Sequence, residues 1–207
     1  MHLKPLPAQD GIRDFTIDDL VLFSDSGRLA VVHRMWSAVT KYAMIIDRTH
    51  SQALQGVRDF LKDAQPAAGE DELDDLAVAE MEHQMLSDSD SYIVKSLLFF
   101  LLVSFNEFAL KRIYSLYQPP EAAPPKRGAV QFIVTALKRL EAIKEVPISY
   151  KANFEKHIDP VRNGFTHGEW EEIGEALGTV DLTQSFLSVA EYFGAIQENL
   201  RVQGFDV

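Results

Sequence analysis

The residues best suited to chemistry lie in one short stretch of the sequence, DPVRNGFTHGEW, residues 159–170. Arg162, Asn163 and His167 stand close together there, and on a helix Asn163 and His167 lie one turn apart on the same face. Histidine, with an unperturbed pKa of about 6.5, can take a proton from a hydroxyl group at neutral pH. Arginine offers a planar fork of donors that holds a phosphate as charge builds on it. The stretch therefore has the parts of a metal-free site for RNA cleavage.

Such a site also needs a second acid, because the leaving 5′-oxygen must be protonated while the base holds the proton of the ribose 2′-hydroxyl. One histidine cannot do both at once. A symmetric dimer that brings two copies of the stretch face to face would supply the second histidine. The sequence thus predicts a homodimer if the site is catalytic.

The charge distribution places this stretch at the end of a basic region. The net charge is −11, which by itself argues against a nucleic-acid partner. Residues 70–90 hold nine acidic residues and no Lys or Arg, whereas residues 126–167 hold eight basic against four acidic residues. Lys151, Lys156 and His157 are therefore candidates to bind the substrate phosphates. They are equally compatible with ordinary exposed helix positions.

The elements that must position these residues are all expected to be helices. Apolar residues recur at helical spacing over about 26–62 and 129–146, and residues 87–117 run without Gly or Pro and are apolar on nearly every side. Shorter helices are expected at TIDDLVLF near residue 16, over the acidic stretch that begins at residue 71, and from Pro147 to His157. We expect Asp159-Pro160 to start the motif helix, Gly168 to end it, and Asp181 with Gln184 to cap the last helix. The sequence predicts an all-α helical bundle.

Two regions are expected along the chain. Residues 1–85 form an N-terminal helical region that packs on or extends the bundle, and residues 86–207 form the helical domain that carries the motif. A Pro-rich connector at 118–128 interrupts the second region. Glu107, with Asn106 beside it, intrudes on the apolar helix. It either pairs with an arginine such as Arg162 or faces solvent.

The motif resembles that of the HEPN family, small helical-bundle proteins marked by an Arg, four to six residues and a His, often with a polar residue after the Arg. Here it reads Arg162-Asn163-Gly164-Phe165-Thr166-His167, and the resemblance covers roughly residue 87 to the C-terminus. It implies an up-and-down core and a dimer whose motifs meet in a cleft. It also implies metal-independent endoribonuclease activity of the kind found in toxin–antitoxin, defence and RNA-processing systems. By the same resemblance His167 is general base or acid, Arg162 clamps the phosphate and Asn163 orients them.

Three other interpretations stay open. A catalytically inactive HEPN-like module would bind a cognate protein partner instead of cleaving RNA. A helical regulatory protein unrelated to HEPN would use the acidic 70–90 segment as its contact surface. His167 before Gly168 also fits a helix C-terminus, where a positive ring is favourable, with Arg162 paired to Glu155, Asp159 or Glu169.

No cofactor, metal or membrane is expected. The pair Glu80 and His83 has the Glu-x-x-His spacing of di-iron bundles, but such a site needs two of these pairs and the second is missing. There is no cysteine, which fits a reducing compartment. The most apolar run, residues 97–105, is too short to cross a bilayer and the first residues lack a signal-peptide core. We therefore expect a cytoplasmic protein.

Overall fold

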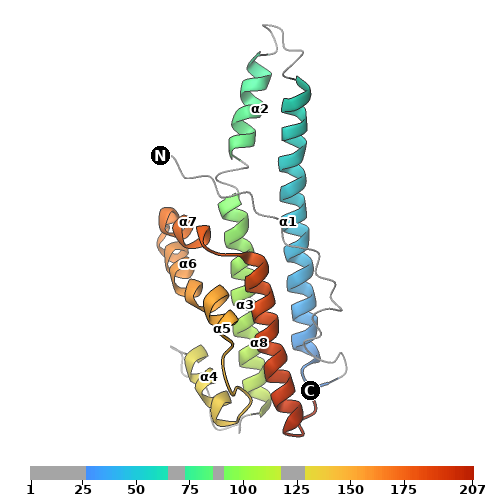
Figure 1. The fold of residues 1–207 in the computed structure, drawn as a ribbon, viewed down its shortest axis with the longest axis vertical. Coiled ribbons are helices and arrows are strands. Elements are labelled where there is room, and N and C mark those ends of the chain that lie inside the picture. Colours follow the sequence, from blue (N-terminus) through green and yellow to red (C-terminus); the bar gives the residue numbers. More distant parts are fainter. Residues whose placement is uncertain (1–26, 65–72, 86–90, 118–128) are drawn as a thin grey trace.

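The computed structural model describes residues 27–64, 73–85, 91–117 and 129–207. Every regular element in these ranges is helical, so the fold is an all-α bundle (Figure 1). Figure 1 uses the following labels: α1 (Ala30–Ala64), α2 (Leu73–Met85), α3 (Ser91–Tyr117), α4 (Ala129–Arg139), α5 (Ile148–Tyr150), the π-helical turn η4 (Lys151–Glu155), α6 (Lys156–His167), α7 (Trp170–Gly178) and α8 (Leu182–Val202). The expected helix near residue 16 and the connector at 118–128 lie outside the described residues.

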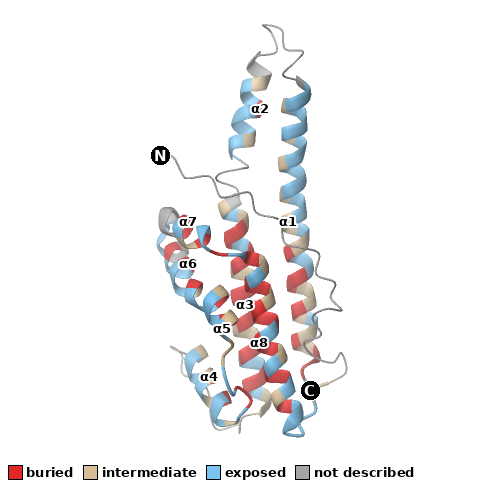
Figure 2. Cartoon of the chain, viewed as in Figure 1, coloured by how far each residue is buried: buried red, intermediate tan, exposed pale blue. Residues whose placement is uncertain are grey.

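The core of the bundle is built around α3, between α8 and the first half of α1 (Figure 2). Trp36 of α1 packs against Phe105 of α3 with ring centroids 4.8 Å apart, and Phe105 packs edge-on against Phe193 of α8 at 5.3 Å. These three rings are almost completely buried. Aromatic pairs in such offset or edge-on arrangements stabilise a core beyond the area they bury. An apolar surface on nearly every side predicts burial all round, and the structure buries α3 only in part: Ile93 and Leu97 near its start are exposed.

α3 is also the one described helix that is long and apolar enough, by length and composition, to cross a membrane. Just over half of its apolar window, 56%, is buried inside the protein. The core helix of a bundle has this same composition, because neighbouring helices cover it on several sides. The apolar character of α3 is explained by its packing in the core.

The helix expected over residues 129–146 is shorter than its apolar pattern suggested, and that prediction is wrong at its end. α4 stops at Arg139, and Glu141 adopts a left-handed conformation with φ 57°. The Ala142 N–H donates to the Leu137 carbonyl and the Glu141 N–H to the Lys138 carbonyl, both at 3.0 Å. This is the Schellman arrangement, which usually places glycine in the left-handed position. With Glu141 there, no glycine marks the end of the helix.

The expected helix start at Asp159-Pro160 is also wrong. Pro160 lies inside α6, which begins at Lys156 and follows η4 without a break. Proline inside a helix removes one backbone donor and crowds the preceding turn. The π-helical turn η4, residues 151–155, comes directly before α6. Such wider turns shift the hydrogen-bond register of a helix and often occur at kinks. Gly168, with φ 71°, ends α6 as predicted.

The second half of α1 pairs with α2 and extends beyond the rest of the bundle (Figure 1). We call residues 47–64 of α1 together with α2 the hairpin arm. Figure 2 shows the arm mostly exposed, in contrast to the first half of α1. The first half of α1 shares one continuous core with α3 and α8. Of the described residues before 85, those of the first half of α1 therefore pack in the bundle, and those of the hairpin arm extend beyond it.

Candidate functional site

The motif helix α6 has a clear division into an inner and an outer face. His157, Val161 and Gly164, at helical spacing, are buried. Lys156, Asn163 and His167 are exposed, and their spacing of seven and four residues aligns them along the opposite side. Arg162 is exposed as well, with 56% of its side chain accessible, and lies at the edge of this face. Arg162, Asn163 and His167 are therefore all exposed on one helix: Asn163 and His167 share a side, and Arg162 lies about 100° around the helix from Asn163.

Two glycines fix the place of α6 against α7. A Cβ atom at Gly164 would lie 2.7 Å from Cγ1 of Ile173 and 3.3 Å from the Glu169 carbonyl oxygen. Only a residue without a side chain permits that approach of the two helices. At the end of α6 the N–H of Gly168 donates to the Gly164 carbonyl. The Asn-Gly pair of the motif thus has one residue that faces outward and one that allows close packing.

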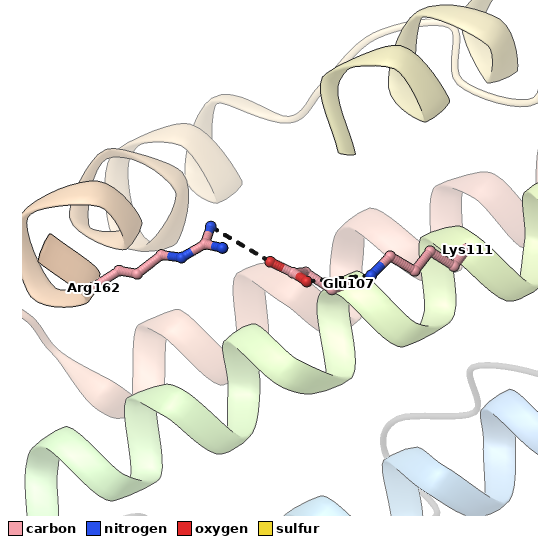
Figure 3. Close-up of polar contacts among 3 residues, drawn as sticks. All are labelled: Glu107, Lys111 and Arg162. Atoms are coloured by element: carbon pink, nitrogen blue, oxygen red, sulfur yellow. Dashed lines mark ion pairs between the residues drawn. The ribbon is translucent and has the colours of Figure 1, made fainter. Parts of the chain in front are cut away.

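Arg162 is tied to the core helix through Glu107 (Figure 3). Nη1 of Arg162 lies 3.6 Å from Oε1 of Glu107, and Nζ of Lys111 lies 3.5 Å from Oε2 of the same carboxylate. Of the two alternatives for Glu107, pairing with an arginine is confirmed, and the arginine is Arg162. The carboxylate is half-buried and stands between two cations, so the local charge of the three residues is positive. This edge suits an anionic ligand that competes with Glu107 for Arg162.

The three candidate substrate-binding residues do not share one environment. Lys151 and Lys156 are exposed, but His157 is buried with 6% of its surface accessible. The expectation that His157 contacts substrate or faces solvent does not fit this inward position. Burial, and after it the positive charges of Lys156 and Lys95, holds the pKa of His157 below its ordinary value. Its imidazole is therefore kept neutral inside the bundle.

Sequence reasoning missed Lys95 of α3, a cation that lies almost fully inside the bundle. Its exposure is 3%, and its Nζ atom has no hydrogen-bond partner among the described residues. Burial lowers the pKa of Lys95 to about 8, against the opposing attraction of Asp181. The residues next to Lys95 in the sequence, Val94 and Ser96, do not predict that other helices cover the side of α3 on which it lies. Its environment is created by the packing of α7 and α8 on α3.

Buried polar contacts fasten the segment that leads into α6. The Tyr150 hydroxyl donates to Oδ1 of Asn106 at 3.0 Å inside the core, which explains why α3 carries an amide beside Glu107. Burial raises the pKa of Tyr150, so its hydroxyl stays a donor. The Ser185 hydroxyl donates to the Asn153 carbonyl at 2.7 Å, a partner for one oxygen of the π-helical turn. The base of the motif helix is thus held to both α3 and α8.

The cap of α8 is as predicted, because Oδ1 of Asp181 accepts from the Gln184 N–H at 2.9 Å. Within the described ranges no group of three or more His, Cys, Asp or Glu side chains is placed to hold a metal ion. Comparison of the chain with protein-family models, curated proteins and solved structures finds no match. The residues of α6 and their neighbours are therefore the only basis for assigning a function.

Proposed function

We propose that this protein is a HEPN-like, metal-independent endoribonuclease that acts as a homodimer. One observation supports it most: Arg162, Asn163 and His167 are all exposed on α6, and the Arg162 guanidinium pairs with Glu107 of a second helix. A helix fixed on its inner face and exposed on its outer face is a rigid platform for catalytic side chains. That arrangement favours a site over an ordinary helix end.

The proposed reaction uses one histidine from each subunit. His167 of one protomer takes the proton of the ribose 2′-hydroxyl, and the 2′-oxygen attacks the adjacent phosphorus. The bond from phosphorus to the 5′-oxygen breaks, and the protonated His167 of the second protomer gives that oxygen its proton. The products are a 2′,3′-cyclic phosphate and a 5′-hydroxyl end. Arg162 stabilises the extra negative charge that the phosphorane carries in between.

Glu107 has a positioning role in this mechanism. Its carboxylate holds the guanidinium at the edge of the outer face, and an RNA phosphate offers the same planar fork a stronger acceptor. Lys111, already beside Glu107, remains there to neutralise the carboxylate when Arg162 turns to the phosphate. The lysines on the exposed side, Lys151 and Lys156, would then follow the RNA backbone on either side of the cleavage point.

A second candidate is the inactive HEPN-like module that binds a protein partner. The observation that favours it is again the Arg162–Glu107 pair, together with the net charge of −11. In this version the carboxylate neutralises Arg162 permanently, and the outer face of α6 meets a protein surface instead of a phosphate.

The deciding experiment is a cleavage assay on mixed single-stranded and structured RNA in excess EDTA. We expect wild type to release fragments with 2′,3′-cyclic phosphate ends. Arg162→Ala and His167→Ala should each lower the rate by about two to four orders of magnitude, because each removes a phosphate clamp or a proton carrier. Asn163→Ala should have a smaller effect of the same direction, since its amide only orients the others.

Arg201→Ala is the matched control. Arg201 is an exposed arginine at the end of α8 that pairs with a glutamate, Glu198, at 3.3 Å, and it is remote in sequence from the motif. Its variant should cleave at the wild-type rate. If wild type is no faster than His167→Ala on any of these RNAs, the nuclease proposal fails and the binding module takes its place.

A further inference from the structure

Two titratable side chains are buried on the inner side of the motif helix, and the proposed reaction uses neither of them. Lys95 of α3 is 3% exposed and His157 of α6 is 6% exposed. Nζ of Lys95 has no hydrogen-bond partner among the described residues. The positive charges of Lys156 and Lys95 both act on the His157 ring. Lys95 and His157 therefore form a buried pair in which both members can carry a positive charge.

The packed structure tolerates one charge of this pair but not two. A charge taken out of water costs free energy unless a partner balances it. Lys95 carries such a charge at neutral pH, because its pKa is about 8 even after burial has lowered it. Burial, followed by the charges of Lys156 and Lys95, lowers the pKa of His157, so its imidazole stays neutral while the helix is packed.

The charged side chains of the elements around the pair lie at the surface. In η4, the first turn of α6, the described side chains of α7 and the cap of α8, the exposed charged residues are Lys151, Glu155, Lys156, Asp159, Glu175 and Asp181. Asp181 attracts Lys95, and its Oδ1 also accepts from the Gln184 N–H. One carboxylate balances at most one cation, so a protonated His157 would be a second, unbalanced charge inside the bundle.

The segment around His157 has a place to bend. Tyr150 is fastened to α3 through Asn106, and the π-helical turn η4 follows it directly. A change of hydrogen-bond register is a common position for a kink. Movement of α6 from η4 onward would bring His157 into water, where its pKa returns toward the ordinary value of about 6.5. Acid therefore favours the open position of this helix, because the open state binds the proton more tightly.

We propose that Lys95 and His157 form an acid-sensitive switch for the motif helix, in which protonation of His157 beside the buried Lys95 ammonium releases α6 from the core. At neutral pH α6 is packed, and its outer residues are held on a fixed helix. In acid α6 separates from the core while α3, α8 and the first half of α1 stay folded.

The switch concerns the packing of α6 and does not rest on the proposed ribonuclease activity. Opening of the helix is measured on its backbone amides, without RNA. Cleavage is measured at neutral pH, where the helix is packed. Loss of the acid response and absence of cleavage are therefore separate outcomes.

Amide hydrogen exchange of the full chain, followed by mass spectrometry from about pH 7.5 to about pH 5, tests the switch. The rates are corrected for the pH dependence of exchange in unstructured peptides. We expect the protection of η4 and α6 to fall below about pH 6.5, by up to about tenfold per pH unit, the limit for a one-proton step. α8 and the first half of α1 should keep their protection, since carboxylates with ordinary pKa values of about 4 stay charged over this range.

Two variants identify the groups responsible. His157→Gln removes the group that is protonated, so the protection of α6 should change by less than about twofold across the range. Lys95→Met removes the charge that opposes protonation and should weaken the response. The imidazole titration of His157, followed by NMR, measures this coupling directly: its midpoint should lie higher in Lys95→Met than in wild type.

His167→Gln and Lys62→Met are the matched controls, because they replace an exposed histidine of the same helix and an exposed lysine at the end of α1. Both should keep the wild-type acid response, since an exposed group is charged in water without any movement of the helix. The proposal is overturned if α6 keeps its protection in acid, or if all helices lose protection together. It is also overturned if the midpoint of His157 is the same in wild type and Lys95→Met.

Discussion

The two halves of α1 share the same spacing of apolar residues but differ in what surrounds them. In the first half Val32, Trp36 and Val39 are buried at helical spacing against α3 and α8. In the second half Leu54, Val57 and Leu61 keep the same spacing but remain only partly buried, because among the described helices only α2 lies beside them. The helix is continuous through both halves. The apolar spacing of α1 therefore predicts which side packs against a neighbour, but it does not predict how deeply that side is buried.

Both halves of α1 are helical, but they should contribute unequally to the stability of the protein. The first half is held by aromatic packing with several helices, whereas the arm is held by one helix pair. Packing of an amphipathic face supplies most of the stability of helices in proteins. We expect substitutions in the first half to change the free energy of unfolding strongly and those in the arm to change it little when the chain is monomeric.

Trp36→Ala should give the largest effect. Trp36 is 1% exposed and contacts the rings of Phe105 and Phe186, so truncation leaves a large cavity among aromatic side chains. We expect a loss of about 3–5 kcal/mol in the free energy of unfolding, measured by urea denaturation in dilute solution.

Phe60→Ala on the arm is the comparison for Trp36→Ala, since both remove a ring from the same helix. Half of Phe60 is already exposed, so its removal should cost less than about 1 kcal/mol under the same conditions. Equal losses from the two variants would mean that the arm is part of the cooperative core, and the contrast between the halves of α1 would be lost.

Lys95→Met should stabilise the protein by about 1–3 kcal/mol at neutral pH. The variant removes a buried charge without a hydrogen-bond partner and keeps an unbranched side chain of similar length. Lys62→Met, at the exposed end of α1, is the control and should change the free energy of unfolding by less than about 0.5 kcal/mol. Urea denaturation of the three proteins gives the comparison.

The pH dependence of stability identifies the charge as the cause. The pKa of Lys95 is about 8 in the folded protein and close to its ordinary, higher value after unfolding. Between these two values the unfolded chain binds more protons, so the free energy of unfolding should rise with pH from about 8 toward 10. Lys95→Met should flatten this part of the curve relative to wild type. An unchanged slope would show that Lys95 is hydrated in solution.

Much of the fold could be predicted from sequence because its helices are long and periodic. α1, α3 and α8, and the caps at Gly168 and Asp181, follow from apolar spacing and short-range chemistry. Two of the errors, at Glu141 and Pro160, lie where a residue occupies a position that its type usually avoids, and α7 was not expected at all. In both cases backbone hydrogen bonds and tertiary packing outweigh the local preference.

The candidate site was predictable only where its residues are neighbours in sequence. Arg162, Asn163 and His167 share one helix, so spacing alone placed Asn163 and His167 on a common face. Spacing did not identify the residues that neighbour the motif from other helices. The sequence left Glu107 either paired with an arginine or facing solvent, and it gave no indication that Lys95 is buried. The inward turn of His157 depends on how η4 packs on α8 and α6 on α7, which no local pattern contains.

Gly→Ala substitutions at two helical positions should change the free energy of unfolding by small amounts of opposite sign. Gly56 of the arm has no atom within 4 Å of a built Cβ, so Gly56→Ala should stabilise the helix by about 0.5–1 kcal/mol through lower backbone entropy in the unfolded chain. At Gly164 the same gain is outweighed, because the new methyl group would lie 2.7 Å from Cγ1 of Ile173. We expect a net loss of about 1–2 kcal/mol there.

Thermal unfolding of wild type and both variants, at the same low protein concentration, shows whether each substitution raises or lowers the stability. The double variant Gly164→Ala with Ile173→Ala removes Cγ1, the atom that would clash, and should cost less than the sum of the two single variants. If Gly164→Ala instead stabilises the protein as Gly56→Ala does, α6 and α7 can separate slightly without cost. The close approach of these helices would then not fix the motif helix, and the rigid platform proposed for Arg162, Asn163 and His167 would lose its main structural support.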